Sequence, residues 1–128
     1  LVDAPCSCEG VIRKNWNVLS RWSIRTIKHL SYLQKRILRA CLIALKKHGT
    51  LVYSTCTLAP EENEEVIDYA LKNFDLEVEK IKIRNLKARE GILEWEGKKF
   101  DERVSKAVRI YPQDNNTEGF FIAKLKKL

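Results

Sequence analysis

The chain has 128 residues, 45% of them apolar and 9% aromatic, which suits one globular domain and excludes a disordered segment. It has neither the run of about 20 apolar residues that a membrane span needs nor a signal-peptide pattern, so we expect a soluble, cytoplasmic protein without a membrane partner. Its 24 Lys and Arg against 17 Asp and Glu give a net charge of +7, which indicates a polyanionic partner such as nucleic acid or, equally, a solvated lysine-rich surface.

The chain opens on the end of a strand and continues into a loop. Leu1 and Val2, ahead of Asp3, indicate the tail of a buried strand, and residues 4–19 carry the proline, glycine and asparagines of an irregular loop. The chain contains no methionine and begins inside this strand. We therefore expect a fragment of a larger domain, with further motifs upstream of Leu1.

A long helix is predicted to begin near Ser20. Apolar residues recur at steps of three and four and mark the face that we expect to be buried: Ile24, Ile27, Leu30, Leu33, Ile37, Cys41 and Leu45. The lysines and arginines of this segment fall mostly on its other faces, where a solvated surface explains them better than an RNA contact does. Gly49, next to His48, is expected to end the helix in the left-handed conformation.

A strand and a second helix follow in the chain. Residues 50–55 (TLVYST) are β-branched and almost continuously apolar, which predicts a central strand covered by helices on both faces. Residues 60–74 begin with proline and several acidic residues, as the first turn of a helix often does, and their apolar residues share one side. These two segments predict the second strand–helix unit of the fold.

The remaining residues add further strands. Residues 76–83 alternate between apolar and polar as a half-exposed strand does, and residues 119–128 have the pattern of another strand. Residues 84–116 are polar and predict only a short strand around residues 93–95. The order of elements predicts an α/β fold, with parallel strands joined by right-handed crossovers and ligands bound beyond the carboxyl ends of the strands.

The four cysteines do not show the Cys-x-x-Cys spacing of a structural zinc site, so we expect no metal, and a chain with an ordinary core needs no disulfides. Cys41 lies on the apolar face of the predicted helix and Cys8 lies in the loop, and we expect structural roles for both. Cys6 and Cys56 each follow a predicted strand. If those strands are neighbours, about 4.8 Å apart, the two thiols meet in one crevice.

The pattern around Cys6 and Cys56 leaves two interpretations open, buried apolar thiols or reactive ones. The helix expected after Cys56 favours a thiolate near its amino-terminal end, although the acidic residues there partly cancel this effect. A hydrolase that pairs cysteine with histidine is disfavoured, because His29 and His48 lie within or at the end of the long helix, away from the predicted crevice.

Three motifs carry a resemblance to a known family. DAPCSC at 3–8, YSTCTLAPEENEEVI at 53–67 and RIYPQDNNTEGFFIAKL at 109–125 resemble, in order and spacing, the later motifs of the Nol1/Nop2/Sun (Fmu-like) family of RNA cytosine-5 methyltransferases. The resemblance implies a class I S-adenosylmethionine-dependent methyltransferase-like (Rossmann-like) sheet. It also implies that residues 1–128 are the C-terminal portion of the catalytic domain, without the N-terminal cofactor-binding portion, so we expect the fragment to be inactive alone.

The resemblance also implies the reaction and its residues. The expected activity transfers a methyl group from S-adenosyl-L-methionine to carbon 5 of a cytosine in tRNA or rRNA through a covalent cysteine adduct. By its place in the motifs Cys56 resembles the nucleophile and Cys6 the residue that assists its release. Asp3 matches the aspartate near the cofactor and the target base, and Pro5 would hold that loop rigid beside the cofactor.

Other loop residues allow more than one interpretation. Arg13 and Lys14 follow the first motif and would contact RNA phosphates or, equally, remain solvated. Trp16 and Trp22 would stack on a base, although buried anchoring of the loop explains them better. A different class of function also remains, in which the chain is a noncatalytic basic RNA-binding or assembly fragment that retains the motifs.

Overall fold

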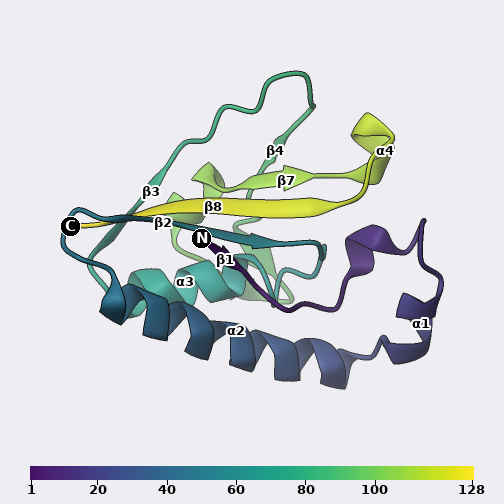
Figure 1. Ribbon diagram of the computed structural model, residues 1–128, viewed down its shortest axis with the longest axis horizontal. Coiled ribbons are helices and arrows are strands. Elements are labelled where there is room, and N and C mark those ends of the chain that lie inside the picture. The colour runs from purple at the N-terminus through teal and green to yellow at the C-terminus, as the bar shows by residue number, and fades with distance from the viewer.

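A six-stranded sheet forms the centre of the computed structural model, which describes residues 1–128 (Figure 1). Its strands are β1 (Val2–Asp3), β2 (Thr50–Thr55), β3 (Leu76–Glu79), β4 (Arg89–Glu90), β7 (Val108–Ile110) and β8 (Phe120–Lys127). The strand order is β1-β2-β8-β7-β4, and β3 pairs with β8. Two further short strands, β5 (Glu94–Trp95) and β6 (Lys98–Lys99), pair only with each other. This mixed α/β architecture confirms the expected fold class.

Two helices lie side by side against one face of the sheet, as Figure 1 shows. They are α2 (Ile24–Ala44) and α3 (Glu64–Asn73), and the shorter helices are α1 (Asn17–Arg21), α4 (Pro112–Asn115) and the 3-10 turns η1 (Glu9–Val11) and η2 (Glu102–Lys106). The expectation that helices cover β2 on both faces is therefore wrong for this chain. No helix has the combination of length and apolar character that crossing a bilayer requires.

The pairing of β1 with β2 is parallel, as expected, and matches Val2 with Tyr53 and Asp3 with Ser54. The other strand pairs are antiparallel, which the expectation of a parallel sheet missed. Strand β8 lies between β2 and β3, so those two strands are parallel to each other without touching. The order of elements along the chain does not reveal this, because β8 comes from residues far beyond both of its neighbours.

The buried face of α2 agrees with the predicted one only in part. The buried residues are Ile27, Ser31, Gln34, Leu38 and Leu42. Of the predicted residues, Ile27 is buried and Ile37, Cys41 and Leu45 pack partly buried against the core, whereas Ile24 is 61% exposed. Ser31 and Gln34 are polar, and hydrogen bonds offset much of the cost of burying them. The Ser31 hydroxyl donates to the carbonyl of Glu61 at 2.6 Å, and the Gln34 amide nitrogen donates to the carbonyl of Pro5 at 2.8 Å, whereas the Gln34 side-chain oxygen is buried without a partner. Buried polar positions such as these cannot be predicted from the spacing of apolar residues.

The ends of both main helices also differ from expectation. Helix α2 begins later than Ser20, after the N-cap Ser23, and ends at Ala44. His48, with a φ of 61°, adopts the left-handed conformation that was expected of Gly49. Helix α3 begins at Glu64 because residues 60–63 form a hydrogen-bonded turn. Residues that resembled the first turn of a helix thus lie ahead of it.

The segment 84–116, for which only one short strand was predicted, carries several elements. Strand β5 confirms the strand expected around residues 93–95. The sequence pattern missed β4, β7, η2 and α4, each of which is too short for periodicity to stand out. Strand β3 has the expected alternation, with Leu76 and Val78 buried, but it ends at Glu79.

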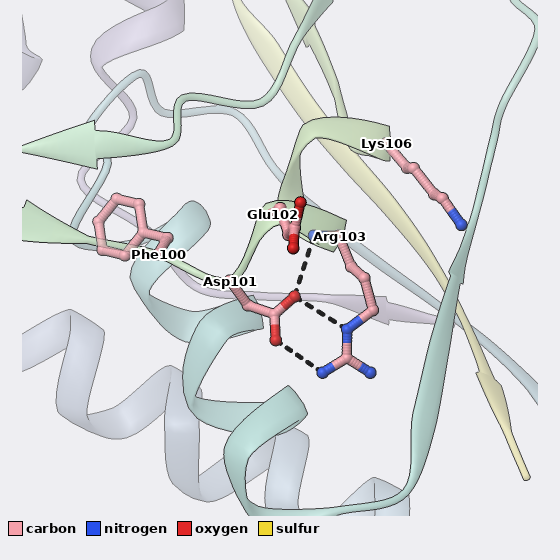
Figure 2. Close-up of a pocket in the computed structure, with 5 residues that line it drawn as sticks. All are labelled: Phe100, Asp101, Glu102, Arg103 and Lys106. Carbon is pink, nitrogen blue, oxygen red and sulfur yellow. Dashed lines mark hydrogen bonds and ion pairs between the residues drawn. The ribbon is translucent and has the colours of Figure 1, made fainter.

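A cavity of about 610 Å³ lies beside η2, lined by Phe100, Asp101, Glu102, Arg103 and Lys106 (Figure 2). Its polar wall is an ion pair in which the Arg103 guanidinium donates to both carboxylate oxygens of Asp101, at 2.8 and 2.7 Å. The same guanidinium donates to the carbonyl of Leu76 at 2.9 Å and so ties η2 to β3. None of the four cysteines lines this cavity.

This ion pair predicts an acid-sensitive contribution to stability. Hydrogen bonds from Arg103 lower the pKa of Asp101 from 3.8 to about 2. Because the carboxylate form is favoured by folding, its contribution is complete above about pH 4 and is lost as the pH falls through about 2. We expect Asp101→Asn to lower the melting temperature at pH 6 and to change it little at pH 2.

Thermal unfolding of the two proteins across this pH range measures the effect, with the neighbouring Glu102→Gln as the matched control. A melting temperature that falls equally in Asp101→Asn at both pH values would contradict the assignment.

Candidate active site

The thiols of Cys6 and Cys56 meet at one edge of the sheet. Cys56 directly follows β2, and Cys6 follows β1 in the next loop. Their Sγ atoms are 3.2 Å apart, close enough for one S–H to donate to the other sulfur. The prediction that neighbouring strands bring these two thiols together is confirmed.

Cys8 lies beside this pair, although the sequence analysis expected a purely structural role for it. Its Sγ is 3.9 Å from that of Cys6, and the Sγ atoms of Cys6, Cys8 and Cys56 all lie within 4.8 Å of one another. Cys8 has a φ of 59°, which is uncommon for a residue other than glycine. Cys41 instead packs against the core from α2, in keeping with the role expected for it.

The thiol pair has unusual electrostatics. A hydrogen bond with Cys56, burial, and repulsion from a charged Cys56 together raise the pKa of Cys6 well above its usual range. Burial first, and then the charge of Cys6, raise the pKa of Cys8. Two thiolates 3.2 Å apart would repel each other, so Cys6 and Cys56 resist losing both of their protons.

A cavity of about 310 Å³ opens next to the thiols. Cys6 and Cys8 line it together with the apolar side chains of Val11, Val18 and Leu30, and Cys56 lies behind Cys6 rather than in the lining. The volume is sufficient for a planar ring the size of a nucleobase. Neither histidine lines this cavity, as the sequence analysis expected.

A buried carboxylate positions the loop that carries Cys6. Glu62 is fully buried and accepts hydrogen bonds from the backbone N–H of Ser7 at 3.0 Å, from the Ser7 hydroxyl and from the Gln34 amide at 2.9 Å. Burial raises the pKa of Glu62, and these donors partly oppose the rise. Gln34 also donates to the carbonyl of Pro5 at 2.8 Å, so both ends of the Pro5–Ser7 segment are held.

The next residues along, Asn63 and Glu64, hold other segments in the same way. The Asn63 side chain accepts from the Thr55 hydroxyl at 2.6 Å and donates to the carbonyl of Thr57 at 3.0 Å, on either side of Cys56. Glu64 binds a buried arginine of β7. From the sequence, this acidic run was predicted to begin a helix. Its role in positioning the loops around Cys6 and Cys56 was not predicted. The available signal was five consecutive polar residues, 61–65, enclosed by apolar ones.

Gly10 lies where all three motif segments cross. Its N–H donates to the carbonyl of Cys56 at 2.8 Å, and its carbonyl accepts from the N–H of Gly119 at 2.9 Å. A Cβ atom at Gly10 would lie 2.4 Å from the Gly119 carbonyl oxygen and 2.6 Å from that of Cys56. Only glycine permits this approach of backbones.

Gly10→Ala is therefore expected to destabilise the protein by about 1–3 kcal/mol and to push the Cys6 loop away from Cys56. Urea unfolding measures the first effect and the rate of thiol alkylation measures the second, which should rise. Gly97→Ala is the matched control, because a Cβ at Gly97 meets nothing within 4 Å and adds only the strain of a φ of 77°, without a steric clash. The alkylation rate of Gly97→Ala should equal that of the unchanged protein. An unchanged rate in Gly10→Ala would show that the close backbone approach at Gly10 does not hold the Cys6 loop against Cys56.

The predicted cofactor residues lie at the exposed end of β1. One carboxylate oxygen of Asp3 accepts from the Ser54 hydroxyl at 2.9 Å, and the rest of this exposed carboxylate faces outward. Pro5 is also exposed, and its carbonyl is held by α2. Neither residue lines the cavity beside the thiols.

The predicted RNA-contacting residues are engaged with the segment ahead of β8. The Arg13 guanidinium donates to the Thr117 carbonyl at 3.0 Å and to the Asn116 side chain at 2.7 Å. Lys14 pairs with Glu118 at 2.6 Å, with 74% of the lysine side chain exposed. Their observed partners are thus within the chain, and contact with RNA stays a prediction.

The tryptophans of the loop are not buried. Trp16 is 72% exposed and Trp22 is 44% exposed, so the expectation of buried anchoring is wrong for both. The Trp22 indole N–H donates to the Glu9 carboxylate at 2.8 Å, which fixes the loop through a surface hydrogen bond. Polar contacts therefore hold the loop, at the surface through Glu9 and beneath it through the buried Glu62 and Gln34.

Comparison with known proteins places these motifs in a family. A family model described as 16S rRNA methyltransferase RsmB/F matches residues 1–126. The chain is 51% identical over 127 residues to the tRNA (cytosine(49)-C(5))-methyltransferase of Pyrococcus abyssi, and the match covers 99% of this chain and 40% of that protein. This chain therefore spans less than half the length of that relative.

Solved structures show the same relationship. A methyltransferase homolog from Pyrococcus horikoshii superimposes with a TM-score of 0.85 at 41% identity, covering 99% of this chain and 38% of that one. NSun6 from Pyrococcus horikoshii, solved with SFG, gives a TM-score of 0.80 at 33% identity and covers 98% of this chain and 29% of that one. With its two cysteine motifs and this fold, the chain belongs to the RsmB/F methyltransferase family, within the Nol1/Nop2/Sun group that the motifs indicated.

Proposed function

We propose that this chain carries the catalytic cysteine pair of an S-adenosylmethionine-dependent RNA cytosine-5 methyltransferase acting on tRNA or rRNA. The observation that most directly supports this is the 3.2 Å separation of the Cys6 and Cys56 sulfurs beyond the ends of two adjacent parallel strands. Carbon 5 of cytosine is a poor nucleophile, and addition of a thiolate to carbon 6 makes it reactive. The names of the matched family and relative agree with such a reaction.

The raised pKa of Cys6 supports Cys56 as the nucleophile. With the pKa of Cys6 raised, Cys6 remains a thiol and donates its S–H to the Cys56 thiolate. In the proposed reaction this thiolate forms a bond to carbon 6, and electron density moves into the cytosine ring. The Asp3 carboxyl group, at the end of β1, would hydrogen-bond the cytosine edge and steady the charge at the ring nitrogen.

The same coupling explains how Cys6 would release the product. Once the Cys56 sulfur is bonded to carbon it carries no charge, so the hydrogen bond to Cys56 and the repulsion from it no longer raise the pKa of Cys6, and only burial still does. The Cys6 proton would then pass to water. After carbon 5 has received the methyl group, the Cys6 thiolate takes the proton of carbon 5. The S–C6 bond then breaks, Cys56 leaves as a thiolate, and the pair again holds one proton.

S-adenosylmethionine, when bound, supplies the electrophilic methyl group. Asp3 and Pro5 fit one side of such a cofactor, because both are exposed at the end of the edge strand β1 and the Asp3 carboxylate has acceptor capacity left. We propose that the other contacts come from residues outside 1–128 and that this chain is the C-terminal portion of the catalytic domain. The match to only 40% of the tRNA relative supports this division.

The net charge of +7 supports RNA as the substrate, since phosphates attract a basic surface over a long range. Lys14 is the better candidate for a phosphate contact, because its ammonium remains largely exposed beside Glu118. The reaction needs free thiols, and all four cysteines are free. We therefore place the protein in the cytoplasm, where thiols stay reduced.

Methyl transfer from labelled S-adenosylmethionine to RNA tests this function, with the protein that carries this sequence together with any residues beyond it. The expected product is 5-methylcytosine in tRNA or rRNA. RNA binding that weakens steeply with salt, without any 5-methylcytosine, would instead support a noncatalytic binding or assembly fragment. Absence of both would exclude both functions.

A further inference from the structure

Three sulfurs converge at the end of the sheet, and the proposed reaction uses only two of them. The Sγ atoms of Cys6 and Cys8 are 3.9 Å apart, and the three Sγ atoms of Cys6, Cys8 and Cys56 lie within 4.8 Å of one another. Zinc binds thiolates at about 2.3 Å, so two thiolates in a tetrahedral site lie about 3.8 Å apart. The Cys6–Cys8 separation already matches this value. Cys56 needs to move away from Cys6 by about half an ångström and toward Cys8 by at most about one, because their sulfurs lie no more than 4.8 Å apart.

The backbone orients the third sulfur toward the pair. Cys8 adopts the left-handed conformation, with a φ of 59°. Its carbonyl accepts from the N–H of Val11 at 3.0 Å, while the hydrogen bond from Gly10 to the Cys56 carbonyl locks the same turn onto β2. A strained conformation that persists in a turn held at both ends is a feature typical of binding sites.

The surroundings leave one coordination position open. The nearby carboxylates have other partners, because Glu9 accepts from Trp22 at 2.8 Å and from Thr57 at 3.2 Å, and Glu62 binds Ser7 and Gln34. Cys6 and Cys8 line the cavity of about 310 Å³, from which a water molecule can reach a bound ion. Three sulfurs and a water make a tetrahedral set for a soft cation.

We propose that Cys6, Cys8 and Cys56 form a binding site for a thiophilic cation, Zn²⁺ or Cd²⁺, that withdraws the catalytic pair from reaction. Each thiol that binds the ion releases its proton to water, and no sulfur changes oxidation state. A sulfur bonded to the ion cannot add to carbon 6 of cytosine. The inhibition therefore rests on the proposed function, whereas the binding of the ion does not.

Titration with Cd²⁺ tests the binding, followed by the sulfur-to-metal charge-transfer absorption in the ultraviolet. We expect one ion per chain in the unchanged protein and at least about a 100-fold weaker affinity in Cys8→Ser, which retains only two of the thiols. Cys41→Ser is the matched control and should bind as the unchanged protein does. No charge-transfer band, or equal affinities in the unchanged protein and Cys8→Ser, would overturn the site.

The inhibition is tested by the ratio of methyl transfer with and without Zn²⁺. This ratio should fall strongly in the unchanged protein and in Cys41→Ser, and much less in Cys8→Ser at the same ion concentration. A Cd²⁺ complex in a protein that transfers no methyl group would leave the metal site standing and refute the proposed function. Methyl transfer without any Cd²⁺ complex would do the reverse.

Discussion

Cys56→Ser is expected to reduce methyl transfer by a factor on the order of 10³ or more, because the reaction then lacks the sulfur that adds to carbon 6. Cys6→Ala is expected to stop the reaction at a later point. In that variant Cys56 still adds to the base, but no neighbouring thiolate takes the proton of carbon 5. A covalent protein–RNA adduct should therefore accumulate.

Denaturing gel electrophoresis with labelled RNA separates these outcomes, because only a covalent adduct survives the denaturant. The unchanged protein and Cys41→Ala, whose thiol lies on α2 outside the site, should turn over without a stable adduct. An adduct in Cys56→Ser that is missing in Cys6→Ala would reverse the two roles. Adduct formation by neither variant would refute the covalent reaction.

The second large effect is expected at the ion pair between Arg109 of β7 and Glu64 of α3. The guanidinium donates to both carboxylate oxygens, at 2.5 and 2.6 Å, and the two side chains are 2% and 0% exposed. Its third nitrogen donates to the Leu58 carbonyl at 2.9 Å. Burial opposes the charged form, but the hydrogen bonds and charge of Glu64 outweigh it and raise the pKa of Arg109.

Arg109→Met is expected to lower the free energy of unfolding by about 3–5 kcal/mol, because it leaves the Glu64 charge buried without a cation, with only the N–H of Ile92 still donating to it. The double variant Arg109→Met with Glu64→Met should recover much of this loss, since no charge is then buried. Urea unfolding at neutral pH measures both.

The matched control for this pair is Arg89→Met. Arg89 also binds both oxygens of a carboxylate, that of Asp114 at 2.7 Å, but its side chain is 56% exposed. We expect little or no change in the free energy of unfolding there, as for other exposed pairs. Equal losses in Arg109→Met and Arg89→Met would show that burial does not set the strength of these pairs.

The elements with strong local patterns could be predicted from the sequence. The β-branched run at 50–55 predicts a strand, and the periodic apolar residues of α2 and α3 predict helices. These elements follow from residues close together in the sequence. The position of Cys56 after one strand and Cys6 after another then placed both thiols at one edge of the sheet, since parallel neighbours end together. The pairing of β1 with β2 is the only contact between distant residues that this placement requires.

The remaining features depend on partners that are distant in sequence. Glu62 is buried because Ser7 and Gln34 satisfy it, and no pattern within residues 60–74 distinguishes such a carboxylate from a solvated one. The approach of Cys8 to the thiol pair likewise depends on its left-handed backbone, which a cysteine adopts only when the surrounding turn imposes it. Hydrophobic periodicity therefore predicts the wrong environment for polar residues that bind buried partners.

The insertion of β8 between β2 and β3 sets an order of events during synthesis. Residues 121–126 pair with all six residues of β2, yet they leave the ribosome after every other strand described here. At about 5–20 residues per second, the edge of β2 stays uncovered for roughly 3 to 13 seconds after its translation. Through that interval the nascent chain presents open backbone donors and acceptors beside an apolar surface, so correct assembly depends on that edge meeting no other strand before its own arrives.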